Sequence, residues 1–352
     1  MRRFLQRSGA YAQGQDDRLK LDNMPRNGAL AGLSAGLAAA HAAYGNPRAV
    51  VLFVVQDGER NAFDQRALEW QLFERHGAIA VLRLSFRELH ARAAVDADDG
   101  TLRIDGVHEV AVVYYRAGYG PADYDDERAW DTRLALERSS AIKCPSVALQ
   151  LAGSKKVQQV LAEPGELERF LDQGACASEL DPAPVHRLDL TDAAHLLASF
   201  AGLWPMDDTP LGLEGQRLAR AEPHRFVLKP QREGGGNNVY RDAIPPFLDE
   251  LDRRDAGLDA GAPRYREAYI LMELIESPAD QQAWMSKKGT ERATRATDVV
   301  SELGIYGVAL FDDSGTILAN ETVGHLLRTK ARESDEGGVA VGFSVIDSPL
   351  LV

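Results

Sequence analysis

A glycine-rich segment, FVLKPQREGGGNN at residues 226–238, holds the residue types best suited to chemistry. A short apolar run ends at Lys229, and three consecutive glycines follow, Gly234, Gly235 and Gly236. Backbone N–H groups of glycine can approach a phosphate closely because no Cβ intervenes, and a lysine neutralises phosphate charge. The segment is neither a Walker A loop, since the chain has no Gly-Lys-Ser/Thr triplet, nor a Rossmann fingerprint. Taken alone, it leaves two interpretations open, a phosphate-binding loop and a flexible hairpin turn.

Downstream segments favour the phosphate-binding interpretation. Residues 270–273 end an apolar run in a carboxylate, a pattern that can line an adenine slot. Glu302 opens a further strand, where a carboxylate could hold a ribose hydroxyl or magnesium. Arg328 and Lys330 supply cations beside a second glycine-rich stretch at residues 333–342. Each segment alone is more simply a strand end or a loop, but together they predict a site for ATP and an anionic substrate.

The elements that must position these residues begin with an α/β unit in the first half of the chain. Apolar residues at helical spacing and short β-branched runs alternate there, a pattern typical of parallel strands joined by helices. We predict helices over residues 28–44, 62–76 and 127–140, and strands over residues 50–55, 80–84 and 110–115.

The pattern changes after about residue 151 and predicts an antiparallel α+β half. Asp312 to Gly315 (DDSG) predicts a hairpin turn between the last two strands. We predict short helices over residues 155–161, 166–171 and 193–201, and strands over residues 226–229, 269–273, 301–311 and 317–320.

Composition limits the classes of function that the chain can serve. Its 352 residues are 45% apolar and 26% charged, a globular composition long enough for about two or three domains. A net charge of −13, from 40 Lys and Arg against 53 Asp and Glu, argues against nucleic-acid or anionic-membrane partners. The longest apolar run, residues 49–55, is too short for a membrane span.

The cysteines and the first residues bear on the compartment. Cys144 and Cys176 form no Cys-x-x-Cys motif, which argues against structural zinc or a disulfide framework and favours a reducing compartment such as the cytoplasm. The basic start MRRFLQRS fits either an amphipathic surface helix, which we favour, or a mitochondrial presequence. We expect Cys144 to be a buried small apolar side chain and Asp96 to Gly100 to be a solvated hairpin turn rather than a calcium loop.

Long motifs resemble those of eukaryotic-type glutathione synthetases, which are ATP-grasp ligases, from about Leu21 to Val352. The motifs are ERNAFDQRAL at 59–68, VYYRAGY at 113–119, ERSSAIKCPSVALQLAGSKKV at 137–157, KPQREGGGNNVY at 229–240, SELGIYG at 301–307, VGHLLRTK at 323–330 and GGVAVG at 337–342. The resemblance implies an α/β chain with an ATP-grasp α+β domain at 151–352, an inserted parallel-sheet α/β substrate-binding domain at 47–150, and a helical remnant at 1–46.

The resemblance also implies ATP-dependent ligation of γ-glutamylcysteine to glycine through an acyl phosphate, in a cytoplasmic homodimer. Arg328 and Lys229 are the implied catalytic residues, and Glu233 is the implied Mg²⁺ ligand. The implied nucleotide-binding residues are Lys155, Lys229, Gly234, Gly235, Gly236, Asn237, Asn238, Tyr240, Met272, Glu273, Leu274, Ile275, Glu302, Lys330 and Glu336. The implied substrate-binding residues are Glu59, Asn61, Gln65, Arg116, Tyr119, Arg328, Val339 and Ala340.

Some positions depart from the family pattern and keep other readings open. Ala117 replaces an acidic residue after the arginine, Leu274 a lysine in the adenine strand, and Glu336 an aspartate in the closing loop. Val341 replaces a small alanine, which leaves a sister ligase with another amino-acid acceptor as an alternative. Nothing upstream of Gly28 resembles the family's N-terminal portion with its arginine and Glu-x-Asn magnesium pair. We therefore expect either a truncated sequence of an active enzyme or an impaired paralogue that binds nucleotide or dimerises.

Overall fold

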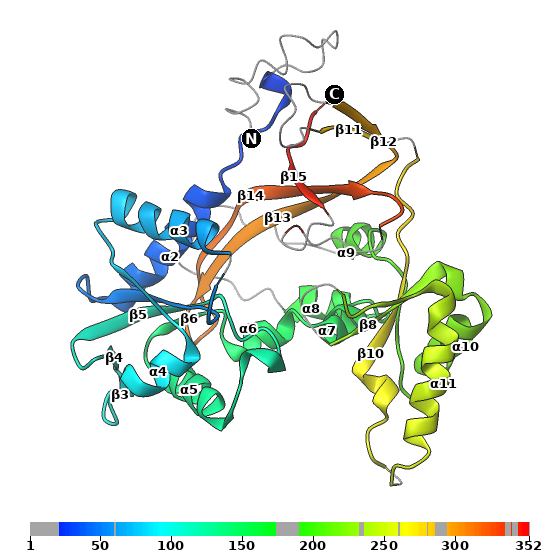
Figure 1. The fold of residues 1–352 in the computed structure, drawn as a ribbon, viewed down its shortest axis with the longest axis horizontal. Helices are drawn as coiled ribbons and strands as arrows, with labels where there is room; N and C mark the ends of the chain where they lie inside the picture. Colours follow the sequence, from blue (N-terminus) through cyan, green and yellow to red (C-terminus); the bar gives the residue numbers. More distant parts are fainter. Residues whose placement is uncertain are drawn as a thin grey trace.

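The computed structural model describes residues 21–59, 61–173, 190–231, 236–259, 261–279, 281–285, 294–334, 339 and 344–351. These residues form a mixed α/β structure with a six-stranded, a four-stranded and a three-stranded sheet and a separate two-stranded pair. Figure 1 shows the six-stranded sheet on one side of the molecule and the four-stranded sheet on the other, with the long strands of the three-stranded sheet between them. No helix in this described part combines the length and apolar character needed to cross a membrane.

The six-stranded sheet contains the parallel unit that the sequence predicts. Strands β2, β1, β5 and β6 pair in parallel in that order, and an antiparallel hairpin of β4 and β3 extends the sheet from β5. The bounds are β1 Val50–Val54, β2 Val81–Leu84, β3 Ala93–Val95, β4 Leu102–Ile104, β5 His108–Tyr115 and β6 Ile142–Cys144.

Helices cover both faces of this sheet, which explains why its central strand is apolar along its whole length. Helices α2 (Ala29–Tyr44) and α3 (Ala62–Arg75) pack Leu37 and Leu72 against Phe53. Helices α4 (Phe86–Arg92) and α5 (Glu127–Arg138) cover the opposite face, where their side chains bury Leu52 and Val54. The predicted helices and strands of this half are confirmed to within a few residues.

Residues 96–100 form a short turn between β3 and β4. The Asp96 backbone N–H donates to the Thr101 carbonyl at 2.9 Å, and the Gly100 N–H donates to the Asp96 carbonyl at 3.0 Å. The expected hairpin turn is confirmed. The expectation for Cys144 is wrong, because this residue is exposed at the end of β6, the outermost parallel strand, where no further strand covers it.

The four-stranded sheet is antiparallel, as predicted for the second half, with the order β7-β10-β8-β9. Phe226 and Leu228 on β8 face a core shared with two helices that the sequence did not reveal, α10 and α11. The bounds are β7 Leu203–Pro205, β8 Phe226–Pro230, β9 Val239–Tyr240, β10 Tyr269–Glu273, α10 Pro210–Ala221 and α11 Ile244–Asp255. Connecting elements are α6 Val147–Ala152, α7 Lys155–Leu161, α8 Glu166–Gln173, α9 Leu190–Leu197, η1 Leu21–Asn23, η2 Pro121–Asp123, η3 Pro223–Arg225, η4 Arg241–Ala243 and η5 Tyr265–Ala268.

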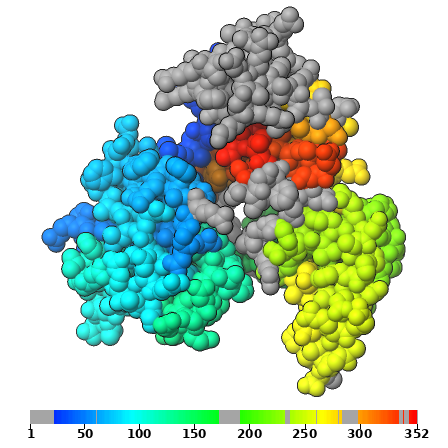
Figure 2. Space-filling view, viewed as in Figure 1, coloured from blue at the N-terminus to red at the C-terminus, as the bar shows by residue number. Residues whose placement is uncertain are grey.

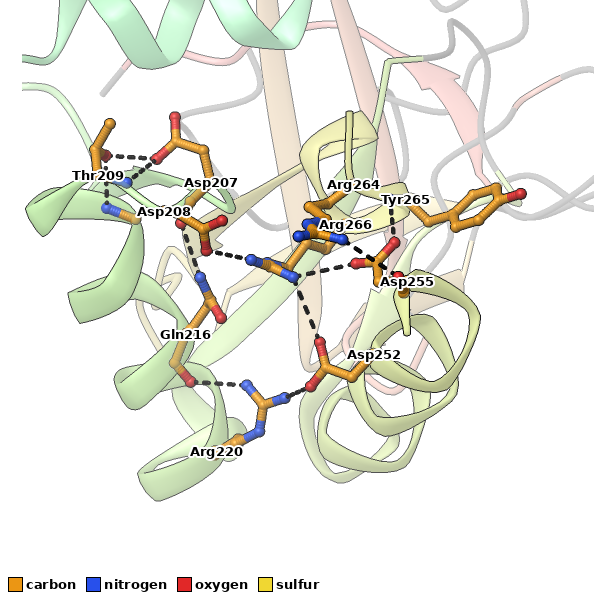
Figure 3. A network of polar contacts seen from close by, with 11 residues as sticks. Asp207, Asp208, Thr209, Gln216, Arg220, Asp252, Asp255, Arg264, Tyr265 and Arg266 are labelled. Carbon is orange, nitrogen blue, oxygen red and sulfur yellow. Dashed lines mark hydrogen bonds and ion pairs between the residues drawn. The ribbon is translucent and has the colours of Figure 1, made fainter. Parts of the chain in front are cut away.

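A buried arginine joins the helices of this half (Figure 3). The Arg266 side chain is 11% exposed and makes ion pairs with Asp208, with Asp255 at 3.1 Å and with Asp252 at 3.8 Å. Asp255 also accepts a hydrogen bond from the Tyr265 backbone N–H at 2.7 Å. Removing Arg266 would leave the buried Asp255 carboxylate without its charged partner, at a cost of about 3–5 kcal/mol. The network therefore fixes α10 and α11 against the segment that leads into β10.

The three-stranded sheet is built on a long antiparallel ribbon of β13 (Val299–Phe311) and β14 (Ile317–Ala331), which β15 (Val345–Asp347) extends. The predicted turn is confirmed, since the Gly315 N–H donates to the Asp312 carbonyl at 3.0 Å. The predicted end of the last strand at residue 320 is wrong. Strand β14 continues to Ala331 because its backbone pairs with β13 as far as Val299. A separate pair consists of β11 (Gln282–Met285) and β12 (Thr294–Thr297).

Helix α2 connects the ribbon to the six-stranded sheet through glycines spaced four residues apart. A Cβ added at Gly32 would lie 2.2 Å from the Val323 Cβ on β14, and one at Gly36 would lie 2.6 Å from Val308 Cγ1 on β13. The helix backbone therefore lies directly on the ribbon. In the space-filling view, the blue-to-teal lobe and the green-to-yellow lobe stand apart in their lower parts, below the orange and red ribbon (Figure 2).

Candidate active site

Two lysines from separate elements interact electrostatically beside the four-stranded sheet. Lys229 is half-buried near the end of β8, and Lys155 is the first residue of α7, which packs against β7 and β10. Burial lowers the pKa of Lys229, and the neighbouring Lys155 ammonium lowers it further, whereas Glu302 acts in the opposite direction. Two ammonium groups so placed repel each other, and an anion between them would relieve that repulsion.

The ribbon contributes an ion pair to the same place. Glu302 on β13 and Arg328 on β14 are directly opposite in the antiparallel register and form an ion pair. The neighbouring Thr329 is buried and bonds to Ser301 Oγ at 2.9 Å and to Asp347 at 2.8 Å, which fixes this part of the ribbon. Lys155 and Glu302 both act electrostatically on Lys229, and Glu302 pairs with Arg328, so these interactions link the four predicted residues. Lys330, two residues after Arg328, projects from the same face of β14.

The described end of the glycine loop borders a small cavity. Gly236 adopts a φ of +87°, a conformation that favours glycine, and the Asn238 side chain donates to the Tyr240 hydroxyl at 3.0 Å. The Gln231 side chain accepts a hydrogen bond from the Lys156 backbone N–H at 3.0 Å, which ties the end of β8 to α7. The cavity has a volume of about 270 Å³ and is lined by Pro230, Gln231, Asn237, Ala268 and Tyr269.

Successive residues of the strand predicted to line the adenine differ in their contacts. Met272 pairs with Val227 across the sheet, and both project from the face that carries Lys229, opposite the core under α10 and α11. Glu273 instead forms an ion pair with Arg225 at 2.8 Å. The Leu274 backbone N–H donates to the Arg225 carbonyl at 2.8 Å, and the Ile275 side chain is 74% exposed. Met272 is thus the side chain of this strand best placed for an apolar ring, while nucleotide contacts of residues 273–275 stay predictions.

The residues predicted to hold γ-glutamylcysteine gather at the carboxyl ends of β1 and β5. Glu59 accepts hydrogen bonds from the Asn61 backbone N–H at 2.7 Å and from Gln65 Nε2 at 2.8 Å. Burial raises the pKa of the Tyr119 hydroxyl, which Arg116 opposes and Glu59 reinforces. The Glu59, Gln65 and Tyr119 side chains therefore belong to one cluster at the sheet edge where α/β folds bind ligands, and Asn61 joins it through its backbone.

Neighbouring charges hold this cluster in shape. The Arg116 guanidinium makes an ion pair with Asp64 at 2.9 Å, and its backbone N–H donates to the Val54 carbonyl at 2.7 Å. The Gln65 side-chain oxygen accepts from Arg83 at 2.5 Å. Asp64 was not among the predicted residues, although it lies inside the family motif at residues 59–68. The available signal was a second carboxylate in this motif, five residues after Glu59.

A cavity of about 440 Å³ lies at the same sheet edge, on the side of α4 and α5, and includes none of the predicted site residues. It is lined by Val55, Gln56, Asp57, Ser85, Phe86, Arg87, His90, Ala117, Ala122, Asp123, Asp125, Asp126, Arg128 and Ala129. The predicted cluster and this cavity thus flank the loop that follows β5.

Some predicted site residues lie outside the described residues, namely Glu233, Gly234, Gly235, Glu336 and Ala340, as does Val341. Val339 is described as part of a turn. Among the residues that the structure describes, no group of three or more His, Cys, Asp or Glu side chains is placed to hold a metal ion.

Comparison with known families places this chain in a family. A family profile, eukaryotic glutathione synthase, ATP binding domain, matches residues 1–351 of this chain. The chain belongs to the eukaryotic glutathione synthase family. The resemblance inferred from the motifs is thereby confirmed.

Individual members of the family give the extent of the likeness. The chain is 42% identical to the chloroplastic glutathione synthetase of Solanum lycopersicum over 331 residues, which cover 94% of this chain and 54% of that protein. It is 43% identical to the glutathione synthetase of Homo sapiens over 318 residues, covering 90% of this chain and 60% of that protein. The chain thus spans between half and two thirds of the length of these relatives.

A solved structure shows the same fold. The apo form of a glutathione synthetase-like effector from Globodera pallida superposes with a TM-score of 0.63 at 22% identity, covering 93% of this chain and 62% of that one. The mixed α/β architecture is therefore of the ATP-grasp type found in this family, as the sequence predicts.

Proposed function

We propose that this chain carries the ATP-grasp site of a glutathione synthetase, which joins γ-glutamylcysteine to glycine at the expense of ATP. The observation that carries the proposal is the convergence of Lys155, Lys229, Glu302 and Arg328 from α7, β8, β13 and β14. Cations from three elements and one carboxylate suit a nucleoside triphosphate beside a carboxylate substrate. The 42–43% identity to named glutathione synthetases supports this choice of substrates.

The proposed reaction has two steps. The cysteinyl carboxylate of γ-glutamylcysteine attacks the γ-phosphorus of ATP, and ADP leaves. The glycine amine then attacks the acyl phosphate, loses a proton and displaces inorganic phosphate. Lys155, Lys229 and Arg328 would offset charge on the transferring phosphoryl group, so that catalysis rests on positioning and electrostatics.

The two carboxylate-facing arginines have different tasks in this proposal. Arg116, with Glu59, Gln65 and Tyr119, would hold γ-glutamylcysteine, because a guanidinium binds a carboxylate through paired hydrogen bonds. Arg328, released from Glu302, would face the reacting carboxylate. Val339 and Ala340 would lie beside the glycine.

The remaining parts of the proposal concern metal, assembly and location. Mg²⁺ bound to the nucleotide and to Glu233 would neutralise phosphate charge. We further propose a homodimer in the cytoplasm, and a division into residues 1–46, 47–150 and 151–352. Helix α2 packs on both the six-stranded sheet and the ribbon, which supports a structure in which these three parts are held together.

The test is release of inorganic phosphate by the purified chain with Mg²⁺, ATP, γ-glutamylcysteine and glycine. We expect release only when all components are present, and a loss of at least about 100-fold for Arg328→Met, as for removal of a charge-stabilising donor. Nucleotide binding without phosphate release would contradict the proposal and support a non-catalytic nucleotide-binding protein. Faster release with β-alanine or serine than with glycine would instead identify a sister ligase.

A further inference from the structure

The loop that follows β5 is held by a carboxylate outside the predicted site. Asp123 Oδ2 accepts hydrogen bonds from the backbone N–H groups of Gly118 at 2.9 Å, Tyr119 at 2.8 Å and Gly120 at 3.5 Å. Its other oxygen, Oδ1, accepts from Gln56 Nε2 at 3.0 Å. One side chain thus satisfies successive backbone donors of the loop and joins that loop to the segment after β1.

A second set of contacts holds the same loop from its carbonyl side. Gln150 on α6 donates to the Gly118 carbonyl at 2.8 Å, and the Gln150 side-chain oxygen accepts from Arg133 at 3.1 Å. Arg133 is buried, pairs with Glu137 at 3.0 Å and lies 3.8 Å over the Tyr115 ring. The carbonyl side is therefore fixed to rigid elements, which leaves Asp123 to fix the N–H side.

The loop conformation is one that needs such support. Gly118 has a φ of +88°, and a Cβ there would lie 2.9 Å from the Tyr124 hydroxyl. Gly118 is buried, so its backbone N–H requires a partner, and bonds to a carboxylate are stronger than bonds to a neutral acceptor. Asp123 is half-buried, so water would replace it only in part.

The position of Tyr119 depends on this loop, because its own backbone N–H is one of the bonds to Asp123. Arg116 lies three residues earlier, directly after β5, and acts electrostatically on the Tyr119 hydroxyl. A loop that loses its N–H partner would move Tyr119 relative to Arg116, while Arg116 itself stays anchored by Val54 and Asp64.

We propose that Asp123 is a positioning residue for the γ-glutamylcysteine site: it fixes residues 118–120 so that Tyr119 and Arg116 face the substrate together. It acts through the loop and makes no contact with the substrate. The inference rests on the proposed function for the identity of the substrate, but the effect on the loop can be measured without it.

The experiment compares Asp123→Ala and Asp123→Asn with the wild-type chain and with Asp125→Asn. Asp125 is two residues away, its side chain is 75% exposed, and it lies 3.6 Å from Arg87, so it is a matched loss of one carboxylate. Calorimetry measures binding of γ-glutamylcysteine and of ATP, and amide hydrogen exchange reports on residues 118–120. Thermal unfolding checks that each variant is folded.

In the Asp123→Ala variant we expect amide exchange at Gly118 and Tyr119 to rise by at least about 10-fold, because protected donors become accessible to water. Affinity for γ-glutamylcysteine should fall by about 10- to 100-fold, while affinity for ATP stays within about 2-fold, as expected when one positioned hydrogen-bonding group is lost. Asp123→Asn keeps one acceptor oxygen, so its amide exchange and its γ-glutamylcysteine affinity should lie between those of the wild type and Asp123→Ala. Asp125→Asn should match the wild type in every measurement.

The outcomes distinguish failure of the positioning role of Asp123 from failure of the proposed substrate. Faster loop exchange in the Asp123 variants with unchanged γ-glutamylcysteine affinity overturns the positioning role and leaves Asp123 a structural residue. Unchanged loop exchange overturns it as well. A wild-type chain that binds ATP but no γ-glutamylcysteine overturns the proposed substrate, whatever the loop does. If Asp123→Ala does not fold, Asp123→Asn alone decides between these results.

Discussion

At the residue scale, the charged side chains of the proposed nucleotide site destabilise one another when no ligand is bound. Lys229 is half-buried and lies near Lys155, and both effects disfavour its protonated form. Glu302 could compensate, but its carboxylate is also shared with Arg328. An anion bound to this cluster would therefore lower its electrostatic free energy. Binding sites often trade stability of the empty protein for function in this way.

Lys229→Met tests this compromise. The native state lowers the pKa of Lys229 below its ordinary value of 10.5, so the unfolded chain binds the proton more tightly. The stability cost is fully present at neutral pH and disappears as pH rises through the lowered native pKa towards 10.5. The ligand-free variant should thus unfold at a higher temperature than the wild type at pH 7, and the difference should shrink at alkaline pH. Calorimetric scans from pH 7 to 10 measure it.

The same variant should bind ATP about 10- to 100-fold more weakly, since a charged hydrogen bond contributes about 1.5–3 kcal/mol. Lys156→Met is the control, because Lys156 is the neighbour of Lys155 on α7 but has a side chain that is 46% exposed and lies 3.9 Å from Asp207. A Lys229 variant that is less stable than the wild type across this pH range would contradict the charge argument.

Residues that share a predicted role from the motifs lie together in the structure. Glu59, Gln65, Arg116 and Tyr119 meet in space although 60 positions separate the first from the last. What the sequence could not provide was the partner of each group. Asp64, Asp123 and Gln150 are ordinary helix or turn residues until the fold shows which backbone or side chain they contact.

At the element scale, periodicity predicted elements whose burial is uniform and missed those whose burial is set by distant contacts. The buried strand Val50–Val54 and the helix Ala62–Arg75 were found because their apolar spacing is clear. Helices α10 and α11 begin with prolines and carry mixed charge, so their core side was obscured. The extension of β14 beyond residue 320 was missed because its residues mix polar and apolar side chains without clear alternation and are mostly only partly buried.

Helix α2 offers the sharpest test at this scale. Gly32 lies where a Cβ would overlap Val323 of β14, so the helix can approach the ribbon only with glycine there. Gly32→Val should lower the free energy of unfolding by about 1–3 kcal/mol through overpacking, despite the better helix propensity of valine. Urea unfolding at constant pH measures the change.

Ala35→Val is the matched control, because Ala35 is exposed on the same helix and receives the same side chain. It should change stability by no more than about 0.5 kcal/mol. Equal effects of the two substitutions would show that the glycine spacing does not set the contact between α2 and the ribbon.

At the scale of the whole molecule, the residues of the proposed nucleotide site come from different parts of the fold. Lys155 and Lys229 belong to α7 and the four-stranded sheet, whereas Glu302 and Arg328 belong to the ribbon, which α2 joins to the six-stranded sheet. Figure 1 shows the ribbon lying between the two other sheets. A ligand that contacts both groups of residues would therefore connect these parts.

Binding of ATP should accordingly stabilise the chain as a unit. At a ligand concentration of 100 times Kd, the expected gain is about 2.7 kcal/mol, because ATP binds the native state and not the unfolded chain. Calorimetric unfolding with and without ATP and Mg²⁺ measures this gain, and the transition should stay single because both sides of the site are held together. In Lys229→Met the same ATP concentration should give a much smaller rise. An equal rise in the variant, or two transitions of which only one moves, would mean that the nucleotide does not bind across the four-stranded sheet and the ribbon.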